Sequence, residues 1–173
     1  GSEEGVIKGK SELYDYLISN SGFIFYNSDD EKQKIILSEY KNKYGFSQKE
    51  SDLSYTVISE NPNIILSTKN MTFESTLFGS YNIQNIISAI SIGSYFGISI
   101  EKIRKGVSDY IPTNNRSQIV KKNSNKIVLD AYNANPTSMT LAIKSFDKSD
   151  LKNKILILGD MFELGKEENK FHQ

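Results

Sequence analysis

A short polar segment after an apolar strand is the part of this sequence best suited to chemistry. It carries a carboxylate, a phenol, two amides and a proline: Asp130, Tyr132, Asn133, Asn135 and Pro136. In open α/β sheets, ligands bind beyond the carboxyl ends of strands, so polar side chains gathered there indicate a binding site. A plain strand-to-helix turn also explains Asn and Pro at these positions. The segment therefore predicts a polar ligand without identifying it.

Two other polar groups precede it in the chain. Asn82 and Asn85 are three residues apart at the start of a predicted helix, so they share one helix face. Their amides offer the donors and the acceptor that the edge of an adenine base requires. N-capping by Asn82 is the alternative. Arg116 follows a polar, proline-marked stretch, where a guanidinium at a hinge suits bidentate contact with phosphate; a surface arginine and a helix-capping Asp130 are the alternatives.

The elements expected around these residues alternate between helix and strand, which is typical of an α/β fold. We expect helices at 4–18, 31–40, 82–97, 100–110 and 136–146, and strands at 23–26, 55–59, 64–68, 73–78, 117–121, 126–130 and 155–158. Residues 83, 86, 87 and 90 form a buried isoleucine stripe. A boundary near Pro112 divides the chain into residues 1–112 and 113–173. Strands 126–130 and 155–158 are expected to pair in parallel across helix 136–146.

Lys10 is the unusual residue of the first predicted helix. It shares a helix face with Val6, Leu13 and Leu17, where a charge is costly unless it is paired. A lysine that extends its ammonium to solvent is the ordinary alternative.

The composition excludes several classes of protein. The 173 residues include 21 basic and 21 acidic side chains, one histidine (His172) and no cysteine. Balanced charge argues against nucleic-acid partners, and the lack of cysteine excludes disulfides and thiolate metal sites. No apolar run is long enough for a membrane span. We expect a cytoplasmic protein without membrane insertion.

Three strings resemble signatures of the Mur ligase family. Residues 130–139 resemble D-x-Y-N-A-N-P-x-S-M, residues 159–165 (GDMFELG) resemble a second signature, and residues 79–85 fit G-x-[HY]-N-x-x-N. Sister ligases show D-Y-A-H-x-P or D-G-A-H-N-P at the first of these turns. The string YNANP is therefore similar to the branch that adds D-alanyl-D-alanine. One departure is Asn115, which stands where the family has glycine before the arginine.

The resemblance implies a fold and an activity. Residues 1–112 would be the rear part of a P-loop-type central ATPase domain, and residues 113–173 the start of a Rossmann-like C-terminal domain. The activity would be ATP- and Mg²⁺-dependent ligation of UDP-N-acetylmuramoyl-tripeptide to D-alanyl-D-alanine through an acyl phosphate, by a monomeric parent protein.

The resemblance also implies residue roles. A carbamylated Lys10 would be a catalytic ligand of Mg²⁺, and Asn82 and Asn85 would bind adenine. Arg116 and Asp130 would complete the catalytic nucleotide site when the domains close. The residues implied in substrate binding are Tyr132, Asn133, Asn135, Asp160 and Glu163. Helix capping is the alternative for the last two, and an exposed position is expected for His172.

The sequence has no G-x-x-G-K-[ST] phosphate loop. We therefore expect an internal segment of a longer ligase that does not catalyse the reaction alone. The alternatives are a sister Mur ligase, a folylpolyglutamate synthase-like ligase, and a non-catalytic nucleotide-binding module.

Overall fold

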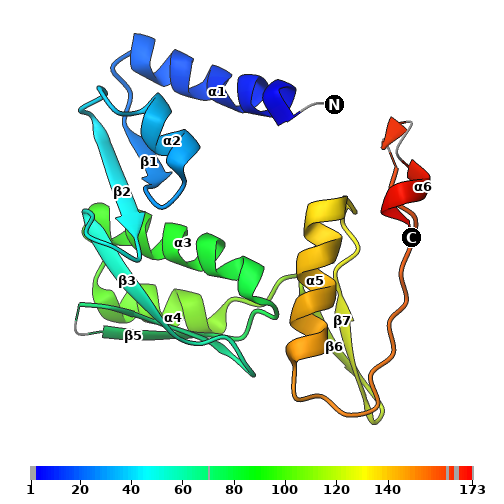
Figure 1. Cartoon of the computed structure of the whole chain (residues 1–173). Helices are drawn as coiled ribbons and strands as arrows, with labels where there is room; N and C mark the ends of the chain where they lie inside the picture. The colour runs from blue at the N-terminus through cyan, green and yellow to red at the C-terminus, as the bar shows by residue number, and fades with distance from the viewer. Residues whose placement is uncertain (1–2, 70, 163, 166–167, 173) are drawn as a thin grey trace.

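The computed structural model describes residues 3–69, 71–162, 164–165 and 168–172, which form a larger and a smaller unit (Figure 1). The larger unit comprises α1 (Glu3–Ser19), β1 (Ile24–Asn27), α2 (Glu31–Ile36), β2 (Lys43–Ser47), β3 (Leu53–Ser59), β4 (Ile64–Thr68), β5 (Met71–Ser75), the 3₁₀ turn η1 (Ser80–Asn82), α3 (Ile83–Tyr95) and α4 (Ile100–Asp109). The smaller unit comprises β6 (Gln118–Lys122), β7 (Asn125–Leu129), α5 (Pro136–Lys148) and α6 (Glu168–Phe171).

The larger unit is built on a five-stranded sheet of order β1-β2-β3-β4-β5. Strands β1, β2 and β3 run parallel, whereas β3, β4 and β5 form an antiparallel meander. The predicted α/β class is therefore confirmed, with a mixed sheet. Strand β2 was not expected from the sequence, because Lys43, Gly45 and Ser47 interrupt any apolar run there.

Helices α3 and α4 supply the core of this sheet. The predicted isoleucine stripe of α3 is buried, and it packs with Ile103 and Val107 of α4 against apolar side chains of the strands. On the sheet side the buried cluster includes Phe46, Leu53, Tyr55, Ile64, Leu66 and Phe73. Because η1 leads directly into α3, this packing fixes the position of the residues that follow Gly79.

Helix α1 presents a different face from the one predicted. Val6 and Leu13 are more than half exposed, and Lys10 is exposed with them. Of the predicted face only Leu17 is half-buried. Ile7 and Tyr14 are also half-buried, and the Tyr14 hydroxyl donates to Gln33 Oε1 of α2 at 3.3 Å. The Lys10 ammonium therefore lies in solvent and carries no burial cost.

The smaller unit consists of a hairpin followed by one long helix. Strands β6 and β7 pair antiparallel, and α5 begins at Pro136 as predicted. The strand predicted at 155–158 is absent, and its side chains are exposed, Ile157 by 94%. A strand exists only where a neighbour satisfies its backbone, and β7 pairs in the described residues with β6 alone. The predicted parallel crossover was therefore wrong for this structure.

Candidate functional site

The strongest polar constellation lies where the two units meet. The Tyr81 hydroxyl of η1 donates to Asp130 Oδ2, just after β7, at 2.7 Å, and it lies 2.8 Å from Ser117 Oγ. The Ser117 amide donates to the other Asp130 oxygen at 3.1 Å. Each oxygen of the Asp130 carboxylate thus accepts a hydrogen bond, one from the larger unit and one from the smaller unit.

Asn82 belongs to the same constellation. It is buried at the N-cap position of α3, yet its side chain does not cap the helix. Its amide donates to Phe78 O at 2.8 Å and to Ser117 Oγ at 2.9 Å, which uses both amide hydrogens. Its oxygen accepts from the exposed Asn85 at 3.2 Å. Of the two predicted adenine-binding amides, Asn85 is therefore the one that faces solvent.

Arg116 lies beside this constellation with its cation exposed. Its guanidinium carbon is 3.7 Å from the centroid of the Tyr132 ring, a stacked cation–π geometry. No carboxylate of the described residues lies within ion-pair distance of it. The preceding Asn115 has φ 56°, a left-handed conformation that glycine adopts freely and asparagine tolerates. Asparagine can therefore stand where the family has glycine.

Burial controls the protonation of Tyr81. Desolvation raises the pKa of its phenol well above the usual value, the Asp130 carboxylate raises it further, and the hydrogen bond from Ser117 lowers it. The phenol therefore keeps its proton at neutral pH and acts as the donor to Asp130.

In the turn after Asp130, polar side chains form hydrogen bonds mainly with the backbone of the same turn. Asn135 forms a capping box with Ser138: its side chain accepts from the Ser138 amide at 2.9 Å, and its own amide donates to Ser138 Oγ at 3.2 Å. Asn133 accepts from the adjacent Ala134 amide and is exposed. Helix α5 is thus capped by Asn135 and not by Asp130.

We expect Asn135→Ala to lower the free energy of unfolding by about 1 kcal/mol, because the first turn of α5 loses its cap. The matched control is Asn133→Ala, which removes a similar amide from the same turn without touching the cap. Urea denaturation of both variants measures the difference. Equal losses would show that the capping box contributes nothing.

Several predicted site residues lie elsewhere. Lys10 is on α1, which runs along the top of the larger unit in Figure 1, whereas α5 and the hairpin lie at the lower right. Asp160 is exposed in the segment without regular structure before α6, and Glu163 lies outside the described residues. His172 is exposed as expected, and its Nε2 accepts from the Met161 amide at 2.8 Å. None of these residues belongs to the junction constellation.

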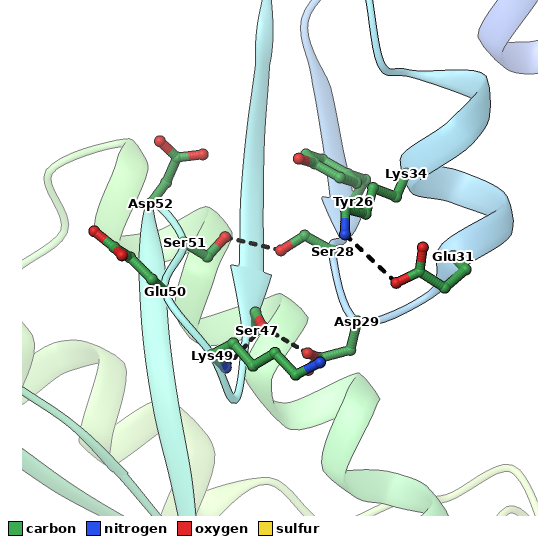
Figure 2. A pocket seen from close by; sticks show the side chains of 10 residues that line it. All are labelled: Tyr26, Ser28, Asp29, Glu31, Lys34, Ser47, Lys49, Glu50, Ser51 and Asp52. Atoms are coloured by element: carbon green, nitrogen blue, oxygen red, sulfur yellow. Dashed lines mark hydrogen bonds and ion pairs between the residues drawn. The ribbon is translucent and has the colours of Figure 1, made fainter.

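A polar pocket of about 450 Å³ lies at the carboxyl ends of β1 and β2 (Figure 2). Four acidic residues line it, Asp29, Glu31, Glu50 and Asp52. Of these, Asp29 is already engaged, because it accepts from Ser47 Oγ at 2.5 Å and from the Gln48 amide at 2.8 Å. Asp30 caps α2 through the amides of Lys32 and Gln33. Residues 27–30 thus form a turn and a helix cap.

Sequence reasoning missed two members of the junction. Ser117 has no pattern of its own, and Tyr81 was noted only as part of a family string. Their partner Asp130 is 13 and 49 residues away along the chain. The position of Ser117 could have indicated its role. It directly follows Arg116 at the predicted hinge, so it lies close to the residues that the two units bring together there.

Comparisons with known proteins define the class of this molecule. Residues 1–93 match the Mur ligase middle domain, and residues 115–173 match the glutamate ligase domain of Mur ligases. The chain belongs to the Mur ligase family. The boundary at residues 112–113 stays a prediction. Among the described residues no helix is long and apolar enough to cross a membrane.

Several similar relatives and structures belong to one branch of that family. The chain is 34% identical over 178 residues to the UDP-N-acetylmuramoyl-tripeptide–D-alanyl-D-alanine ligase of Bacillus subtilis, covering 100% of this chain and 38% of the relative. It is 29% identical to the Escherichia coli ligase of the same name, covering 99% of this chain and 40% of that protein. A crystal structure of MurF from Acinetobacter baumannii superposes with a TM-score of 0.81 at 25% identity, covering 99% of this chain and 39% of that one. The chain thus spans 38–40% of these relatives.

Proposed function

We propose that the protein containing this chain is an ATP-dependent ligase that joins UDP-N-acetylmuramoyl-tripeptide to D-alanyl-D-alanine in peptidoglycan precursor synthesis. One observation carries the proposal: Arg116, Asp130 and Asn85 gather where units matching two Mur ligase domains meet. The names of the similar relatives supply the substrates.

The junction residues fit a nucleotide. Arg116 offers an exposed guanidinium that stacking on Tyr132 orients, and such a fork matches phosphate oxygens. Asp130 is a carboxylate acceptor suited to a ribose hydroxyl, and Asn85 offers an exposed amide edge for adenine. Asn82 supports Asn85 through its oxygen. When bound, ATP supplies the phosphoryl group that activates a carboxylate toward an amine.

The described residues do not by themselves fit a complete Mg²⁺ site. They bring together no set of three His, Cys, Asp or Glu side chains. We propose Lys10, as a carbamate, as one oxygen ligand only, and we derive no step through the metal. The Lys10 side chain is exposed, so carbon dioxide can reach its nitrogen, which adds to it as the neutral amine and releases its protons to solvent.

We assign the acceptor side to the turn beyond Asp130. Tyr132 is exposed and stacks on Arg116, and the next residue in the chain, Asn133, is exposed as well, so we assign both to contact with a peptide that approaches the phosphate group. Asp160 and Glu163 complete the proposed substrate set, whereas Asn135 contributes chiefly by capping α5. The proposed enzyme acts in the cytoplasm as a monomer.

The test is phosphate release by the whole protein, supplied with ATP, Mg²⁺ and UDP-muramoyl tripeptide, with and without D-alanyl-D-alanine. We expect release that depends on the dipeptide. Release with a single amino acid in place of the dipeptide would move the protein to a sister ligase. Nucleotide binding without release for any acceptor would leave a binding module and exclude the proposed reaction.

A further inference from the structure

We propose that Tyr81 is a positioning residue for the nucleotide site, acting with Ser117 to hold the Asp130 carboxylate through a directed chain of hydrogen bonds. This inference rests on the proposed function, since Asp130 matters only where a nucleotide binds. Neither Tyr81 nor Ser117 belongs to the residues that the sequence pattern assigned to the site.

The direction of each hydrogen bond follows from the supply of protons. An ionised carboxylate only accepts, so the single Tyr81 proton goes to Asp130. The contact between the Tyr81 and Ser117 oxygens then requires Ser117 to donate. Ser117 Oγ in turn accepts from the Asn82 amide, whose oxygen accepts from Asn85. Every donor in this chain points toward Asp130.

Burial strengthens the inner part of this chain, at Ser117 and Asn82, whereas the Tyr81–Asp130 hydrogen bond at its end is exposed. Ser117 is only 2% exposed and Asn82 8%. In such surroundings each hydrogen bond polarises the next, and an unpaired polar group is costly. Ser117 also has φ 52°, a left-handed backbone that a non-glycine residue keeps only where its surroundings enforce it. That backbone lets one residue direct its amide to Asp130 and its hydroxyl to Tyr81.

The chain joins the proposed adenine side of the site to the ribose side. Asn85 and Asn82 stand at the start of α3, whereas Asp130 follows β7 in the other unit. Two contacts of the chain cross between the units: the Asn82 amide donates to Ser117 Oγ, and the Tyr81 hydroxyl is the only donor to Asp130 Oδ2 from the larger unit among the described residues. Removing that hydroxyl frees one carboxylate oxygen without opening the core.

The experiment compares Tyr81→Phe with Tyr16→Phe in the whole protein. Tyr16 is 65% exposed on α1, so it controls for loss of a phenol hydroxyl. We expect Tyr81→Phe to weaken binding of a fluorescent ATP analogue, and to raise KM for ATP, about tenfold, the order expected for a hydrogen bond to a charged group. The KM for D-alanyl-D-alanine should stay at the wild-type value. Thermal unfolding of both variants checks that the fold persists.

Ser117→Ala and the double variant test the chain itself. Ser117→Ala keeps the amide that donates to Asp130 but removes the link to Asn82, so we expect a smaller loss in the same direction. The two losses should combine non-additively, because the groups share one network.

Three outcomes would decide against the inference. These are unchanged ATP binding in Tyr81→Phe, a uniform loss for all substrates, or strict additivity of the two changes. A wild-type protein that binds ATP but releases no phosphate would refute the proposed function and not this inference. The ATP-binding measurements would still test whether Tyr81 positions Asp130.

Discussion

Replacing Arg116 with alanine is expected to lower kcat/KM for ATP by about 10²- to 10³-fold, the usual cost of removing one preorganised group that stabilises developing charge. The guanidinium is exposed at the junction and is oriented by the Tyr132 ring at 3.7 Å. Because it is exposed, its removal should change the free energy of unfolding by no more than about 0.5 kcal/mol. The measurement is phosphate release by the whole protein at varied ATP.

Two further variants sharpen this test. Arg104→Ala removes an exposed arginine from α4 and should leave kcat/KM unchanged. Arg116→Lys keeps the charge but loses the planar fork and its stacking on Tyr132, so we expect an intermediate rate. If Arg116→Ala keeps the wild-type kcat/KM, Arg116 does not belong to the site. The proposed mechanism would then have no cation beside Asp130.

The sequence could predict those parts of the fold that periodicity determines locally. The isoleucine stripe of α3 and the start of α5 at Pro136 follow from spacing and capping preferences, and both are confirmed. Strand β2 could not be predicted, because its polar and glycine residues form a strand only between β1 and β3. The strand expected at 155–158 failed for the opposite reason: its apolar residues have no neighbouring strand to pair with in the described structure.

The same division holds for the site. Arg116, Asp130 and the two asparagines were predicted from residue type and family resemblance, and the structure brings them to one junction. What no local pattern could supply is that Tyr81 and Ser117 connect them, since those contacts depend on how the two units pack. The position of Lys10 illustrates the limit, because helical spacing defined its face but not whether that face would be covered.

Gly79→Ala is expected to destabilise the protein more than any other glycine substitution near the site. Gly79 has φ 91° and ψ 129°, a region nearly restricted to glycine, where other residues carry about 1–3 kcal/mol of strain. An added Cβ would also lie 2.2 Å from Cε1 of the Tyr81 ring. The ring must move, and its hydrogen bonds to Asp130 and Ser117 break with it.

A comparison with Gly97→Ala separates the strain of a positive φ from the displacement of the Tyr81 ring. Gly97 also has a positive φ, 68°, but a Cβ there meets nothing within 4 Å. We therefore expect Gly79→Ala to lose at least about 2 kcal/mol more than Gly97→Ala, from two hydrogen bonds of which one is to a carboxylate. Urea unfolding measures both. In a Tyr81→Ala background the excess should shrink to the difference in backbone strain between the two positions, because no ring remains to be displaced. Equal losses in the wild-type background would mean that the Tyr81 ring adapts freely, which would also weaken its assignment as the residue that positions Asp130.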